Sequence, residues 1–128
     1  MEFFATARVE AEEADLQRRL TVSALAQLCE SIDSVLRDEG DDGEIYCLWG
    51  QFRIHRELIR GGVRFTLPGC PNGFAWTLTT GAPPAPDAIV VHCTINRTEH
   101  EADFIETLEM FADAWQQGLE AHAARLAS

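Results

Sequence analysis

An amphipathic pattern near the carboxyl end is the feature that most limits how this chain can fold. Between residues 104 and 126 apolar side chains recur at helical spacing, and they are Phe104, Leu108, Phe111, Trp115, Leu119 and Leu126. Such spacing puts them on one face of an α-helix, and that face must be covered by another element. Thr98 and Glu101 match a capping box, so we predict a helix of about 28 residues that starts directly after Thr98.

A second helix is predicted over residues 10–38. Its apolar stripe repeats at steps of three to five residues and consists of Leu16, Leu20, Leu25, Leu28, Ile32, Val35 and Leu36. Acidic residues crowd its first turn, where the helix dipole favours negative charge. The β-branched and hydroxylated stretch Thr21–Ser23 is compatible with a break, and Gly40 predicts the end of the helix. Residues 3–9 alternate in polarity, which fits either a short strand or a lead into this helix.

The residues between these two helices are typical of β-strands. We predict strands over residues 45–49, 52–60, 63–67, 74–79 and 88–95. Gly61 and Gly62 predict a two-residue hairpin turn in which Arg60 faces Val63. Connections this short imply an antiparallel meander. We therefore predict a single α+β domain over residues 1–128. In it a four- to five-stranded antiparallel meander is flanked by a long N-terminal and a long C-terminal amphipathic helix, both packed on one face.

The charge of the chain excludes several classes of partner. With 21 acidic residues against ten basic ones, all of them arginine, the formal net charge is −11. This charge would repel a nucleic acid or an anionic membrane, so we expect neither as a partner. The charge is unevenly distributed, because residues 45–98 hold five of the ten arginines and only two of the 21 acids. The local excess of arginine fits either ordinary strand polarity or an arginine-lined anion site.

The cysteine pattern and the first residues indicate a reducing compartment. The four cysteines are widely spaced and form no CxxC pair, which favours free thiols over disulfides and over a metal site. The first residues lack the basic and apolar regions of a secretory signal. We therefore expect a cytoplasmic protein with no metal and no cofactor.

The polar face of the predicted hairpin is the first candidate ligand site, and it carries Arg53, His55, Glu57 and Arg64. Two arginines beside a histidine and a glutamate could bind a carboxylate or a phosphate, or perform acid–base chemistry. The same residues also fit a solvated sheet face with cross-strand ion pairs such as Glu57 with Arg64. Both interpretations stay open.

Arg56 and two tryptophans are further candidates. Arg56 is predicted on the apolar face of the hairpin, so it needs a route to solvent or a paired acid, which either helix could supply. Trp49 and Trp76 are typical core residues. The alternative is that they line a ligand pocket between sheet and helices, together with Phe74 and an arginine.

Cys70 is a candidate reactive thiol because it lies in the turn-rich stretch 68–73. A loop thiol near arginines could have a lowered pKa and act as a nucleophile or redox sensor. No histidine adjoins it in the sequence, so a structural turn cysteine is the alternative.

The absence of any catalytic motif favours a non-enzymatic role. The first hypothesis is therefore a small acidic binding or accessory protein that forms a homodimer and binds a protein partner. One alternative is a binding domain or modest enzyme for a small anionic ligand. A second alternative is a thiol redox-sensing module at Cys70.

Overall fold

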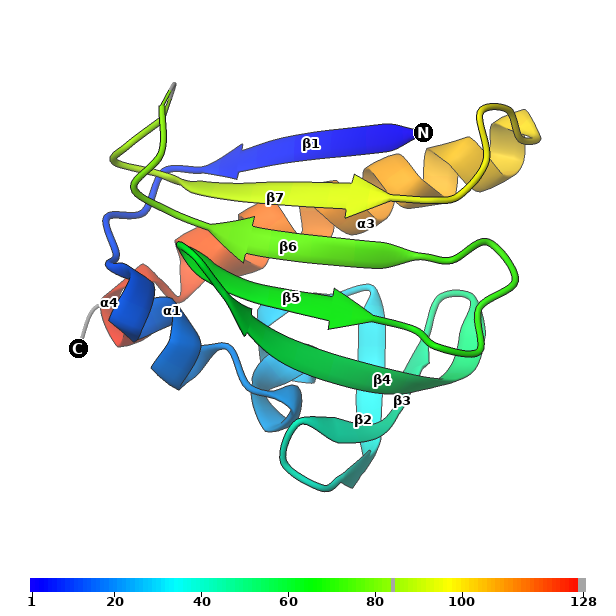
Figure 1. The fold of residues 1–128 in the computed structure, drawn as a ribbon, viewed down its shortest axis with the longest axis horizontal. Coiled ribbons are helices and arrows are strands. Elements are labelled where there is room, and N and C mark those ends of the chain that lie inside the picture. Colours follow the sequence, from blue (N-terminus) through cyan, green and yellow to red (C-terminus); the bar gives the residue numbers. More distant parts are fainter. Residues whose placement is uncertain (84, 127–128) are drawn as a thin grey trace.

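A seven-stranded antiparallel sheet and one long helix form the molecule (Figure 1). The structure is a computed structural model that describes residues 1–83 and 85–126. Its elements in chain order are β1 (Glu2–Ala7), α1 (Glu13–Arg19), the 3-10 turn η1 (Val22–Ala24), α2 (Leu25–Leu28), β2 (Ile32–Asp38), β3 (Asp42–Cys47), β4 (Gly50–Ile59), β5 (Gly62–Thr66), β6 (Ala75–Thr79), β7 (Ile89–Thr94), α3 (Ala102–Ala121) and α4 (Ala123–Leu126).

The strands lie in the order β1-β7-β6-β5-β4-β3-β2. Strands β2 to β7 follow one another as a meander, whereas β1 lies at the opposite edge beside β7. The segment with α1, η1 and α2 therefore carries the chain from one edge of the sheet to the other. The prediction of an α+β fold with an antiparallel sheet is confirmed. The predicted number of four to five strands is wrong, because β1 and β2 extend the sheet to seven.

The N-terminal region differs most from the prediction. A long helix over residues 10–38 is wrong, since α1, η1, α2 and strand β2 take its place. Five of the seven apolar residues that suggested the helix are nevertheless buried, namely Leu16, Leu20, Leu25, Leu28 and Ile32, whereas Val35 is partly buried and Leu36 is exposed. Their burial is achieved by short segments that each change direction, and residues 32–38 pair with β3. The pairing of residues 32–38 with β3 outweighed the local helical pattern, because tertiary contacts override local preference. Residues 3–9, which fitted two structures, contribute to β1.

The long C-terminal helix is confirmed, but it is shorter than predicted. α3 lies across one face of the sheet, behind it in Figure 1, and it buries Leu108, Phe111, Ala112, Trp115 and Leu119. It begins at Ala102, so the predicted start after Thr98 is wrong. The imidazole Nδ1 of His100 accepts a hydrogen bond from the Glu101 N–H at 2.8 Å, and its ring lies 4.1 Å from that of Phe104. His100 therefore stabilises this helix start in place of the predicted capping box.

Gly118 lets α3 pass close to α2. A Cβ atom at this position would collide with the carbonyl oxygen of Leu28, at the end of α2. This close approach lets α2 cover the edge of the core. Only glycine at position 118 allows it without a shift of the backbone.

The hairpin of β4 and β5 keeps the predicted faces but has a different turn. Arg60 and Gly61 form the turn, so Glu57 faces Arg64, and the predicted pairing of Arg60 with Val63 is wrong. Gly61 has a φ of +87°, a conformation that favours glycine. The pairing differs from the predicted one by two residues, and such a shift leaves the side chains within the two strands on their predicted faces.

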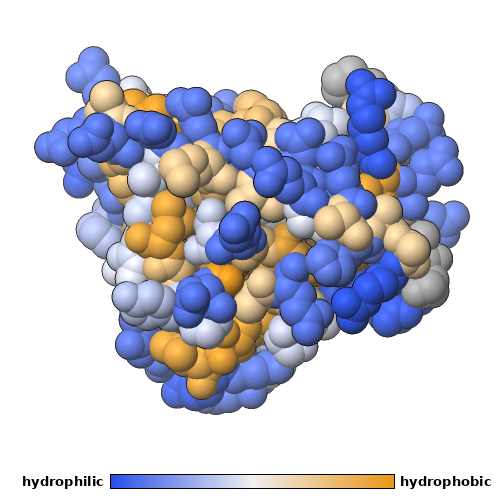
Figure 2. Space-filling view, turned by 180° about the vertical axis from the view of Figure 1, so that it is seen from behind, coloured by the Kyte–Doolittle hydropathy of each residue, from blue (hydrophilic) through white to orange (hydrophobic). Residues whose placement is uncertain are grey.

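The helix side of the molecule is mostly hydrophilic, with patches of exposed apolar surface (Figure 2). Leu48 and Met110 are 38% and 53% exposed, and both line an open groove of about 500 Å³ beside α3. Within residues 1–83 and 85–126, no helix combines the length and the apolar character needed to cross a membrane. The predicted homodimer and a protein partner stay predictions.

Candidate functional site: an aromatic pocket

An apolar pocket lies where α3 begins. Its volume is about 210 Å³, and its walls come from the β3–β4 turn, β4, the loop between β5 and β6, and α3. The lining residues are Trp49, Phe52, Leu67, Cys70, Pro71, Asn72, Phe74 and Phe104. No charged side chain belongs to this set. The pocket therefore suits a small apolar molecule better than an ion, which would lose its hydration without gaining a partner.

Trp49 forms one wall of this aromatic pocket and is held from two sides. The β3–β4 turn that carries it is tight, with Cys47 paired to Gly50 and a φ of +114° at Gly50. The indole Nε1 of Trp49 donates to Oγ1 of Thr107 at 2.9 Å. The Thr107 hydroxyl in turn donates to the Phe104 carbonyl at 2.6 Å. This chain of hydrogen bonds ties the turn to the first turns of α3, so the wall is positioned before any ligand arrives.

The floor of the aromatic pocket is a cluster of rings that continues into the core. Phe74 lies edge-on to Trp49, with ring centroids 4.9 Å apart, and stacks on Trp76 at 5.3 Å. Phe111 on α3 touches all three rings, at 5.2 Å from Trp49, 5.1 Å from Phe74 and 4.9 Å from Trp76. Trp115, about one helical turn further along α3, lies 6.4 Å from Trp76. The space between sheet and helix is therefore filled with aromatic side chains behind this floor.

The structure separates the tryptophans that were predicted to share a pocket. Trp49 and Phe74 line the aromatic pocket, whereas Trp76 is 1% exposed and lies behind Phe74 in the core. No arginine is among the described lining residues. Phe52 and Phe104 were missed by the sequence analysis. Phe104 leads the apolar stripe of α3, which was a usable signal, but only the tertiary structure brings it to the same pocket as Phe52.

The polar face of the β4–β5 hairpin lies on the side of the sheet opposite the buried face. Glu57 and Arg64 form the cross-strand ion pair considered above, with Oε1 and Nη1 2.9 Å apart. His55 Nδ1 lies 2.9 Å from Oδ1 of Asp42 on the neighbouring strand β3. Arg53 is exposed. His55, Glu57 and Arg64 therefore take part in cross-strand pairs on a sheet face away from the aromatic pocket. Anion binding by the four candidates stays a prediction.

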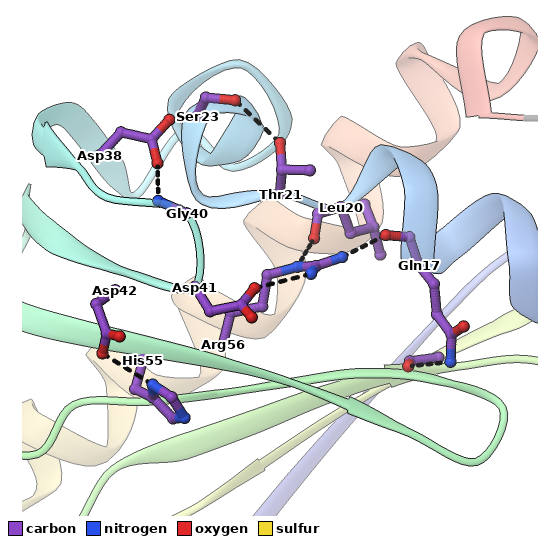
Figure 3. A network of polar contacts seen from close by, with 11 residues as sticks. Gln17, Leu20, Thr21, Ser23, Asp38, Gly40, Asp41, Asp42, His55 and Arg56 are labelled. Carbon is purple, nitrogen blue, oxygen red and sulfur yellow. Dashed lines mark hydrogen bonds and ion pairs between the residues drawn. The ribbon is translucent and has the colours of Figure 1, made fainter.

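Arg56 lies on the buried face of the sheet and is 8% exposed. Its Nε donates to the Leu20 carbonyl at 2.7 Å, its Nη2 donates to the Gln17 carbonyl, and its Nη1 lies 3.2 Å from Oδ1 of Asp41 (Figure 3). Both carbonyls belong to the C-terminal end of α1, where unpaired carbonyls and the helix dipole favour a cation. The acid that Arg56 was predicted to need comes from the β2–β3 turn and not from a helix. Arg56 thus holds α1 and this turn onto β4.

All four cysteines are free thiols, and they differ in exposure. Cys70 is half-buried at the aromatic pocket. Burial raises the pKa of Cys29 and of Cys93 to about 12, and it also raises the pKa of Cys47. These three thiols are therefore poor nucleophiles at neutral pH. Redox sensing at Cys70 stays a prediction.

Arginines gather at a second cavity of about 210 Å³, which lies among α1, α2 and α4. Arg18, Arg19 and Arg125 line it together with His122. Arg18 is paired with Asp15 at 2.9 Å, and all three arginines already have interaction partners. Within the part of the chain that the structure describes, no group of three or more His, Cys, Asp or Glu side chains is placed to hold a metal ion.

Several solved structures share this fold over almost the whole chain. Protein XoxI from Bacillus cereus matches with a TM-score of 0.68 at 11% identity, covering 98% of this chain and 96% of that one. An uncharacterised protein from Bacillus thuringiensis matches with a TM-score of 0.61 at 11% identity, covering 98% of both chains. A START superfamily protein from Mycobacterium smegmatis matches with a TM-score of 0.57 at 14% identity, covering 98% of this chain and 99% of that one.

Likeness at such low identity establishes the fold and nothing further. The chain is an α+β domain with a START-like arrangement of an antiparallel sheet and a C-terminal helix. No family model matches the sequence, and no curated protein matches it significantly.

Proposed function

We propose that this protein is a small-molecule-binding domain whose ligand occupies the aromatic pocket. The observation that carries the proposal is the composition of the pocket, which has four aromatic rings among its lining residues and no charged side chain. A concave, mostly apolar site with few polar groups is the usual form of a small-molecule site. The START-like fold supports a ligand-binding domain in general terms.

The chemistry of the pocket favours a neutral ligand over the anionic one that the sequence suggested. A buried carboxylate or phosphate needs a cation or several donors to replace its hydration. The described lining residues offer the Asn72 amide, the Cys70 thiol and the Trp49 indole N–H as side-chain polar groups. The indole N–H is already bonded to Thr107, and none of the three is a cationic group. Apolar area removed from water supplies the binding energy in such a site.

Titration with indane and with indane-2-carboxylate tests the proposal, because the two probes share a ring system and differ in charge. Binding is followed by two-dimensional NMR of the ¹⁵N-labelled protein. We expect indane to shift the indole N–H of Trp49 and the backbone amides around Cys70. We expect indane-2-carboxylate to bind at least about tenfold more weakly, because its charge is not matched in the pocket.

A pair of variants locates the site. Cys70→Phe places a ring in the pocket and should weaken indane binding at least about tenfold. Leu48→Phe adds a ring in the open groove beside α3, outside the aromatic pocket, and should leave binding unchanged. Unchanged indane binding in Cys70→Phe, or preference for the carboxylate, would contradict the proposal.

A further inference from the structure

The two tryptophans behind the floor of the aromatic pocket have indole N–H groups without an acceptor. Trp76 and Trp115 are 1% and 0% exposed, and neither Nε1 has a hydrogen-bond partner among the described residues. Buried donors are almost always paired, because a lost bond to water is otherwise not replaced. A phenylalanine would fill much of the same space without this cost. Packing alone therefore does not explain two tryptophans here.

Trp49 provides an internal comparison within the same cluster. Its indole N–H is paired with the Thr107 hydroxyl at 2.9 Å. The chain thus pairs the indole in the wall of the pocket and leaves unpaired the two indoles behind its floor. Trp76 is separated from the pocket by Phe74, on which it stacks at 5.3 Å.

The small size of the aromatic pocket also indicates that a ligand reaches behind its floor. Its volume of about 210 Å³ is below the roughly 300–1,000 Å³ that is usual for small-molecule sites. A ligand larger than one small ring system therefore needs space behind the present floor. Phe74 is the floor residue best placed to yield this space, since it precedes β6 and lies outside the regular strand.

We propose that the ligand is a flat apolar molecule with a neutral hydrogen-bond acceptor, such as a carbonyl or ether oxygen. The indole N–H of Trp76 donates to this acceptor when the ring of Phe74 turns aside. Trp115, 6.4 Å from Trp76, supplies a second donor to a ligand with two acceptors. This inference rests on the proposed function and names the ligand class of the same pocket.

Indane and 1-indanone form the matched pair of probes, because they differ by one carbonyl oxygen on the same bicyclic skeleton. Each is titrated into the wild-type ¹⁵N-labelled protein, and the three indole N–H signals are followed. We expect 1-indanone to bind about three- to tenfold more tightly than indane, as one added hydrogen bond allows. We also expect only 1-indanone to move the Trp76 N–H signal downfield, whereas both probes perturb Trp49 similarly.

The variant Trp76→Phe should bind both probes equally, with the affinity that the wild type has for indane. Trp49→Phe should keep the preference for 1-indanone. The wild-type NMR signals decide the question even if Trp76→Phe does not fold. Equal affinity for the two probes, or a downfield shift confined to Trp115, would overturn the inference while the proposed function stands. Failure of both probes to bind would overturn the proposed function as well.

Discussion

Replacing Arg56 with methionine tests whether this arginine holds the N-terminal segment onto the sheet. Methionine keeps a flexible apolar stem in the same place but removes the guanidinium. The Gln17 and Leu20 carbonyls at the end of α1 then lose their donor, and Asp41 loses its ion-pair partner.

We expect the free energy of unfolding to fall by about 3.5 kcal/mol. Each hydrogen bond from a charged donor to a carbonyl contributes about 1.5 kcal/mol here, and two are lost. The Asp41 side chain is 62% exposed, so solvent screening limits the ion pair to about 0.5 kcal/mol. A domain of this kind has a total stability of about 5–15 kcal/mol, so the loss is large enough to measure.

Urea unfolding followed by circular dichroism measures the loss. Arg53→Met is the matched control, because Arg53 lies on the same strand with its side chain exposed, and it should change stability by less than about 0.5 kcal/mol. The loss of stability in Arg56→Met should persist in about 1 M NaCl. Most of it comes from buried hydrogen bonds to carbonyl groups, which salt screens only weakly. Equal stability of the two variants, or a loss that vanishes in salt, would refute the structural role of Arg56.

Glycine packing, thiol burial and assembly can each be tested in solution. Gly118→Ala should lower the free energy of unfolding, measured by thermal unfolding, by at least about 1 kcal/mol, because the added Cβ collides with the backbone of α2. In the control Gly69→Ala the added Cβ meets no atom, so the loss should be less than about 0.5 kcal/mol. Similar losses in the two variants would contradict the close approach of α3 to α2. A thiol reagent at neutral pH should modify Cys70 first. Between pH 9.0 and about pH 12 the free energy of unfolding should fall by up to about 1.4 kcal/mol per pH unit for each of Cys29 and Cys93. The reason is that the unfolded chain releases these thiol protons at a lower pH than the folded protein does. Rapid labelling of several thiols, or a flat stability profile in that range, would argue against their burial. Light scattering should give twice the monomer mass of 14.2 kDa if the expected homodimer forms, and a monomer mass would rule it out at the concentration used.

The candidate site was only partly predictable, because its residues come from segments that lie far apart in the sequence. Trp49 and Phe74 were named for the pocket because aromatic residues cluster in the strand-rich middle of the sequence. Phe104 comes from α3, and its place in the same pocket as Phe52 depends on how α3 crosses the sheet. The burial of Arg56 and its need for an acid followed from strand alternation, yet the identity of that acid, Asp41, depended on a turn that the sequence analysis had placed after a long helix.

The sequence by itself determined the alternation of the β4–β5 hairpin, the amphipathic stripe of α3 and the predominance of acidic residues. The first two depend on neighbours within a few positions, where side-chain spacing directly sets the face that is buried, and the third is a matter of composition. The tertiary structure alone decided that residues 32–38 form a strand, that β1 lies beside β7, and that the indoles of Trp76 and Trp115 have no acceptor. These features depend on contacts between residues far apart in the chain. The free energy of such contacts outweighs local conformational preference, and the local spacing of residues does not reveal them.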